Sequence, residues 1–270
     1  MARKPKEKKP KKQKEVYIPK QGLMGIGEDY HVYYMTRQEK LTGLLIGAAA
    51  GLVIGYVFFN NWIVAVLLAI FAAVKIRKPY QDYLHKKRLK SLLLQFKDLL
   101  EALSASYSAG MATSKAFENA QGEMIQLYGP ESDIAREMQI INVGLQHNLN
   151  IEDLLLNFAD RSGLDDVNSF ANVFDVCNRK GGNLQQIVGD TRKIINDKID
   201  MEMEIQTMVA ASKNELNIMM VMPLIIMLSM RGFGESMTGN SLANIVIKLA
   251  ALAIFAAAYV IGKRMIEIKL

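Results

Sequence analysis

The stretch that decides the fold is LTGLLIGAAAGLVIGYVFF, residues 41–59, which contains no charged side chain. Asn60-Asn61 follow it, and WIVAVLLAIFAAV, residues 62–74, is again uncharged. A helix rises ~1.5 Å per residue and a membrane span needs roughly 17–25 residues. Residues 41–76 are too long for one span, so they predict a transmembrane hairpin with spans at 41–59 and 62–76. The alternative is a buried hairpin within a soluble domain.

A second pair of apolar runs lies near the end of the chain. Residues 216–230 are uncharged and include Pro223, whereas residues 242–262 contain a single charge, Lys248. A short connector, residues 231–241, joins them. This pattern predicts a second transmembrane hairpin, residues 216–262, in which Pro223 either kinks its span or is a tolerated membrane proline.

Basic residues concentrate beside the predicted spans. Residues 1–40, a basic arm, contain eleven Lys/Arg, residues 75–97 contain eight, and the tail, residues 263–270, adds three. The positive-inside rule places all three segments in the cytoplasm, which requires an even number of spans in each cluster. We therefore expect a multi-pass protein of the cytoplasmic membrane with both termini cytoplasmic. Basic flanks also suit anionic lipid headgroups.

The central part of the chain has the opposite charge. Residues 91–215 contain ten Lys/Arg and nineteen Asp/Glu, a net charge of −9, although the whole chain is +6. An acidic folded region argues against nucleic-acid binding. Helical spacing of apolar residues and frequent glycine punctuation predict a cytoplasmic domain of six helices at residues 77–215. The expected fold class is an all-α integral membrane protein, in which two transmembrane hairpins flank this six-helix domain.

Glycines are expected to end the helices of the central domain. We expect breaks at Gly110, Gly129, Gly163 and Gly181-Gly182, because glycine accepts the left-handed conformation that closes a helix. Asn150 is expected to cap one helix, and Asn183 to open the last one as a capping box with Gln186. This longest helix carries a stripe with spacings of four and three that suits packing against another helix, and it runs into the span with Pro223. The stripe consists of Ile187, Thr191, Ile194, Lys198, Met201, Ile205, Met208 and Ser212.

Catalytic and cofactor motifs do not occur in the sequence. There is no nucleotide P-loop, Gly25-Ile-Gly27 lacks the third glycine of a dinucleotide fingerprint, and there is no HExxH metal motif. Cys177 lies on an apolar helix face, which is typical of an inert core thiol. Asp165-Asp166 are interpreted as a helix start and not as an acid–base pair. We expect neither enzymatic activity nor a cofactor or metal.

Four glycines in the first predicted span repeat every fourth residue: Gly43, Gly47, Gly51 and Gly55. They share one helix face and allow another backbone to approach closely. The partner of this face is either the second span of the same chain or another subunit.

Several segments of the central region resemble the type II secretion system F domain. They are NIEDLLLNFADR at residues 150–161, FANVFDVC at 170–177 and KGGNL at 180–184, followed by the long helix into the span with Pro223. The resemblance covers about residues 92–230 and leaves out the basic arm. One such domain between two pairs of spans is similar to the TadB- and TadC-like platform subunits of the tight-adherence (Flp) pilus, and related proteins also serve archaeal filaments.

The resemblance implies a non-enzymatic platform subunit in a type IV pilus-like or type II secretion-like machine. Its implied partners are membrane lipids, a hexameric secretion ATPase, pilin subunits, and a second platform subunit or a copy of itself. The alternatives are a small membrane transporter, for which Lys248 is the only ionisable residue within the spans, and a membrane-anchored helical scaffold or signalling protein.

Two sets of charged residues are candidates for partner contacts. Acidic residues at two predicted helix starts, Glu152, Asp153, Asp165 and Asp166, are expected to dock the ATPase through complementary charge. Lys248 either snorkels to the outer headgroups or pairs transiently with an acidic residue of a pilin.

Overall fold

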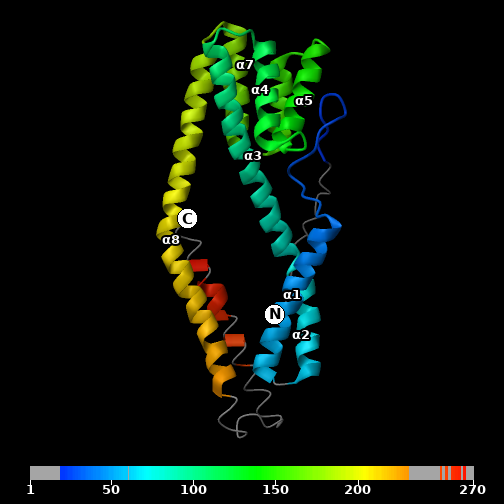
Figure 1. Cartoon of the computed structure of the whole chain (residues 1–270), viewed down its shortest axis with the longest axis vertical. Coiled ribbons are helices and arrows are strands. Elements are labelled where there is room, and N and C mark those ends of the chain that lie inside the picture. Colours follow the sequence, from blue (N-terminus) through cyan, green and yellow to red (C-terminus); the bar gives the residue numbers. More distant parts are fainter. Residues whose placement is uncertain are drawn as a thin grey trace, which may run out of the picture.

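The computed structural model describes residues 19–59, 61–230, 250, 253–254, 257–262 and 264–265. Helices α1 to α8, together with the helical residues 250, 253–254, 257–262 and 264–265, make up the regular structure of the described residues, so the predicted all-α class is confirmed (Figure 1). Their bounds are α1 Arg37–Phe59, α2 Trp62–Lys75, α3 Arg77–Ser108, α4 Thr113–Tyr128, α5 Asp133–Gln146, α6 Ile151–Ser162, α7 Asp165–Lys180 and α8 Leu184–Met230.

The helix ends follow the glycines in the sequence. Four glycines just beyond helix ends have φ between 65° and 83°, a region that costs a residue with a Cβ and suits glycine. They are Gly110, Gly129, Gly163 and Gly181. The predicted breaks are therefore confirmed. Helix α8 continues without interruption past Pro223, as we expected because the sequence showed no break between this helix and the apolar run.

The two asparagine caps have different outcomes. Asn183 Oδ1 accepts a hydrogen bond from the backbone N–H of Gln186 at 3.2 Å, which is the asparagine half of the expected capping box. Asn150 stands at the N-cap of α6, but its side chain makes no bond to the helix backbone. Its Nδ2 donates instead to Asp153 Oδ2 at 3.3 Å, so an acidic side chain in the first turn has replaced the expected backbone contact.

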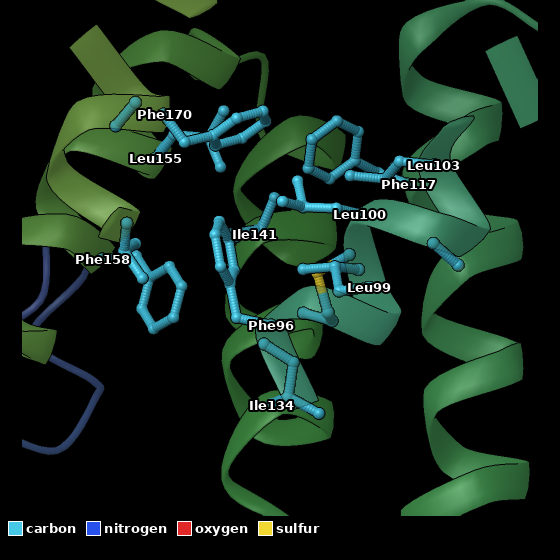
Figure 2. Packing of buried hydrophobic residues seen from close by; sticks show 14 of the residues in the cluster. Phe96, Leu99, Leu100, Leu103, Phe117, Ile134, Ile141, Leu155, Phe158 and Phe170 are labelled. Carbon is cyan, nitrogen blue, oxygen red and sulfur yellow. The ribbon is translucent and has the colours of Figure 1, made fainter. Parts of the chain in front are cut away.

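The core of the helical domain forms around the C-terminal half of α3 (Figure 2). Phe96 contacts the ring of Phe158 from α6 at a centroid distance of 6.3 Å and that of Phe170 from α7 at 5.6 Å. Phe117 from α4 meets Phe174 of α7 edge to face at 6.3 Å. These rings are almost fully buried, and aromatic pairs at such distances stabilise beyond their area. The core thus joins α3, α4, α6 and α7.

Helix α8 runs antiparallel to α3. Gln185 donates to Ser108 at 2.9 Å, and Arg192 and Glu202 of α8 form ion pairs with Glu101 and Lys90. These contacts pair later residues of α8 with earlier residues of α3. If the same spacing continues, residue 216, where the apolar run of α8 begins, lies level with the start of α3. Figure 1 accordingly shows α1, α2 and the far end of α8 at one end of the molecule and α4–α7 at the other.

Three of the four glycines on the face of α1 pack on α2 of the same chain, whereas a Cβ at Gly43 would lie 2.7 Å from the ring of Tyr80 in α3. A Cβ added at Gly51 or Gly55 would lie 2.6 Å from the Cα of Ala69 or Ala65, and one at Gly47 would lie 2.8 Å from the Cα of Ala73. These three alanines are buried and also recur every four residues. Small residues on both helices therefore bring the two backbones together, which answers the question of the partner that the sequence left open.

Among the described residues, α1 is the one helix that is long and apolar enough to cross a membrane. Helix α2 has 14 residues, ~21 Å at ~1.5 Å per residue, against a hydrocarbon core of about 30 Å. The four-span topology is therefore not shown. Residues 231–249, which include the connector and Lys248, lie outside the described part, as do several later positions of the run at 242–262.

Replacing Gly51 by alanine should destabilise the protein, against the usual helix preference. Alanine normally stabilises an exposed helical site by about 0.5–1 kcal/mol relative to glycine. Here the new methyl group meets backbone of α2, so we expect a loss of about 1–3 kcal/mol. The matched control is Gly122→Ala in α4, where the added Cβ has nothing within 4 Å. Unfolding in detergent should show opposite signs for the two variants, and equal stabilisation would contradict the packing.

Candidate functional site: a buried ion pair beneath the N-terminal segment

Residues 20–31, here called the strap, lie across α5 and α6. The backbone N–H of Tyr30 donates to the Arg161 carbonyl at 2.9 Å, and Asn157 Nδ2 donates to the Gln21 carbonyl at 3.4 Å. Tyr30 is 2% exposed and belongs to the core cluster. The sequence grouped these residues with a basic arm, and the structure shows instead that they are part of the helical domain.

An ion pair lies beneath the strap. Arg161 of α6 donates through Nη1 and Nη2 to Glu137 Oε1 and Oε2 of α5, at 2.7 and 2.5 Å, and both side chains are 1% exposed. Burial alone would lower the pKa of Arg161, but the hydrogen bonds and charge of Glu137 hold this pKa above its ordinary value. The bidentate geometry is the arrangement in which a buried pair offsets most of its desolvation cost.

Every donor nitrogen of Arg161 has a partner. Nε donates to Asn157 Oδ1 at 2.9 Å, and Nη1 also donates to the Glu28 carbonyl of the strap at 3.0 Å. Gly27 makes this approach possible, because it has φ 121° and a Cβ there would lie 2.6 Å from Nη1. Gly27 of the Gly25-Ile-Gly27 sequence, which is not a nucleotide motif, thus allows the strap backbone to approach the guanidinium.

Tyr30 of the strap covers the buried ion pair. Its hydroxyl donates to Glu137 Oε1 at 3.1 Å, and burial together with the Glu137 charge raises its pKa far above the ordinary value. Arg88 of α3 stacks over the Tyr30 ring at 4.8 Å from the centroid, a cation–π contact. His85 Nε2 lies 2.7 Å from the Tyr30 carbonyl. The tyrosine therefore connects α3, α5 and α6.

A ring of charges surrounds the strap at the surface. Glu28 forms ion pairs with Arg88 at 2.6 Å and with Arg136 at 3.2 Å. Arg88 also pairs with Asp133 at the start of α5, and these hydrogen bonds raise the pKa of Arg88. A single exposed ion pair contributes little to stability. The buried Arg161–Glu137 pair therefore does most to fix the position of the strap.

An open cleft of about 440 Å³ lies between the strap and α5. Ile26, Ile140 and Val143 supply apolar lining, and Glu28 and Arg136 supply charge.

The buried ion pair is poorly suited to proton transfer. Both carboxylate oxygens of Glu137 are bound to Arg161, and the neighbouring Tyr30 hydroxyl stays protonated, so the Arg161–Glu137–Tyr30 network holds a conformation. In the part of the chain that the structure describes, no group of three or more His, Cys, Asp or Glu could hold a metal ion.

The four acidic docking candidates do not form one surface. Glu152 Oε1 accepts from Asn178 near the end of α7, which makes α6 and α7 antiparallel. Glu152 and Asp153 are therefore separated from Asp165 and Asp166 by most of the length of α6, ~18 Å for 12 residues. Asp166 is also bound to Lys198 of α8 at 2.7 Å. The two pairs of acidic residues lie at opposite ends of a helical hairpin, so docking of a partner at these residues stays a prediction that involves two separate surfaces.

The remaining candidates have structural positions. The Gly182 N–H donates to the Cys177 carbonyl at 2.8 Å, which completes the end of α7, and Cys177 itself is a buried free thiol. Asp165 begins α7, as expected. Pro223 lies inside α8 and is exposed.

Sequence reasoning missed Arg161 and Glu137 as a pair. A signal was present, because each is a charged residue on an apolar helix face. Arg161 lies three residues after buried Phe158, and Glu137 lies between buried Ile134 and Ile141 at helical spacing. A charge in that position needs a buried partner, although the sequence does not say which one.

The chain matches none of the family models, curated proteins or solved structures with which it was compared.

Removing one partner of the ion pair should cost much more than removing both. Glu137→Gln leaves Arg161 buried without its counter-charge, and we expect a loss of about 3–5 kcal/mol in the free energy of unfolding. The double variant Glu137→Leu/Arg161→Met should recover most of this loss. Urea or thermal unfolding gives the comparison, and a double variant as unstable as the single one would contradict the assigned pairing.

Tyr30→Phe should weaken the strap and change its pH dependence. The lost hydrogen bond is expected to cost about 1–3 kcal/mol, because its acceptor is a buried carboxylate. Since the folded-state pKa of Tyr30 is raised, its stabilising contribution is complete below pH ~10 and falls as the pH rises further. The Tyr30→Phe variant should lack this decrease in stability at alkaline pH. The exposed Tyr34→Phe is the matched control and should leave the stability unchanged.

Proposed function

We propose that the protein is a non-enzymatic membrane platform subunit of a type IV pilus-like or type II secretion-like assembly machine. In this role it couples a cytoplasmic secretion ATPase to the insertion of pilin subunits into a filament. The observation that carries the proposal is the continuity of α3 and α8. Both helices contribute to the acidic domain, and both lead to the end of the molecule that bears the apolar helices.

The exposed side chains at that end favour a lipid environment. Ile63, Leu67 and Phe71 of α2 are between 62% and 71% exposed, and Ile218, Met222 and Ile226 of α8 between 50% and 62%. Apolar surface of this extent on several helices is rare on a soluble monomer. It supports two membrane hairpins, with spans at 41–59, 62–76, 216–230 and 242–262, and a cytoplasmic domain at residues 77–215 in between.

A platform must transmit movement between its cytoplasmic domain and the bilayer, and three connections suit this task. Helices α3 and α8 provide two of them. The strap leads to α1 and provides the third, because the buried ion pair fastens residues 20–31 to α5 and α6. The F-domain resemblance adds the ATPase, the pilin and a second platform subunit as proposed partners in the cytoplasmic membrane.

The proposed topology can be tested by cysteine labelling of intact cells. Cys177 is buried, so the native chain provides a low background. A cysteine replacing Lys115, whose side chain is 66% exposed, should resist an impermeant maleimide until the membrane is permeabilised. One placed in residues 231–241 should react from outside. Labelling of the residue 115 variant in intact cells would contradict the topology.

The proposed role predicts association with an ATPase and a filament defect. The tagged full chain, purified in mild detergent, should retain the hexameric secretion ATPase encoded in the same genome. Deletion of the chain should abolish surface filaments while pilin accumulates in the membrane. Filaments at wild-type level in the deletion strain would overturn the proposal, and Tyr34→Phe protein should restore them like the wild type.

A further inference from the structure

The apolar stripe that the sequence placed on the long helix faces the rest of the domain only in part, since Ile187 packs against the core and Lys198 pairs with Asp166 of α7. The most deeply buried residues of α8 are Val188, Ile195 and Val209, which are between 0% and 7% exposed. Ile194, Met201 and Met208 are 63%, 57% and 65% exposed. They recur every seven residues along ~21 Å of helix, on the side that α3 leaves uncovered.

Each exposed apolar residue has an acidic residue one turn before it. Asp190, Asp197 and Glu204 precede Ile194, Met201 and Met208 by four residues, so each pair shares a helix face. The exposed charged residues from 190 to 204 comprise four acids and one base, Lys193. The basic residues Arg192 and Lys198 and the acid Glu202 are only partly exposed and are each engaged in an ion pair within the chain.

We propose that this face of α8, defined by Ile194, Met201, Met208 and the acids Asp190, Asp197 and Glu204, docks a basic amphipathic helix of a partner protein. The partner helix presents apolar residues at heptad spacing and Lys or Arg beside them. The inference does not depend on the filament role, since it concerns the chemistry of one helix face.

The charges distinguish this occupant from a second copy of the chain. Two α8 faces placed together would bring two like-charged surfaces into contact, each with four exposed acids and one base between residues 190 and 204, which is unfavourable. A basic helix neutralises the acids while its apolar residues cover the stripe, as in helix-on-helix recognition by complementary flanking charges. This face is distinct from the acidic residues at the starts of α6 and α7.

The test measures binding of synthetic helices to the full chain in lipid nanodiscs. The probe is a fluorescent peptide of about four heptads, with leucine at its apolar positions and lysine at its flanking positions. A second peptide carries glutamate in place of each lysine. We expect the lysine peptide to bind at least about tenfold more tightly than the glutamate peptide, with affinity falling as salt rises.

Matched variants assign the binding to the proposed face. Met201→Ser should weaken the lysine peptide about tenfold or more, whereas Met203→Ser, a 58% exposed methionine on another side of α8, should not. Asp197→Lys should weaken it similarly, and Glu118→Lys on α4 should not. Equal loss with Met203→Ser, equal binding of both peptides, or no binding would overturn the proposal. Concentration-dependent self-association that Met201→Ser removes would overturn it in favour of a second copy.

Discussion

The buried pair between Arg161 and Glu137 is the interaction on which the helical domain depends. It joins α5 to α6, and the free lone pairs and donors of the pair are used to hold the strap through Tyr30 and the Glu28 carbonyl. An uncompensated charge in that position would be costly, so the two helices and the strap have to be in place together. The pair therefore makes the position of the chain entering α1 part of the folded domain.

The two ends of the molecule are held together by different forces. In the helical domain, large aromatic rings such as Phe96 and Phe170 fill the space between helices. In the α1–α2 pair, small residues remove that space, and Gly51 and Ala69 bring the backbones into contact. Large side chains suit a core that water drives together, whereas close backbone approach suits an apolar solvent in which the hydrophobic effect does not draw helices together. This contrast is consistent with a domain in water joined to helices in lipid.

Local signals accounted for most of the fold. Glycines at 110, 129, 163 and 181 set the helix ends because a positive φ is a property of a single residue. Helical spacing of apolar residues predicted the helices of the domain in the same way. The docking candidates Glu152, Asp153, Asp165 and Asp166 are close in sequence but do not share one surface. Two antiparallel helices separate their starts by a full helix length, and that separation is a property of their packing.

The sequence by itself determined the helices, the glycine stripe and the opposite charges of the central domain and its flanks, because each depends on residues within a few turns of one another. Only the tertiary structure decided which distant residues meet. It paired Arg161 with Glu137, placed residues 20–31 over both, and turned Ile195 of α8 inward while leaving Met201 in solvent. A periodic stripe fixes the angle between side chains on one helix. The face that is buried depends on the neighbouring helices, whose positions no local pattern encodes.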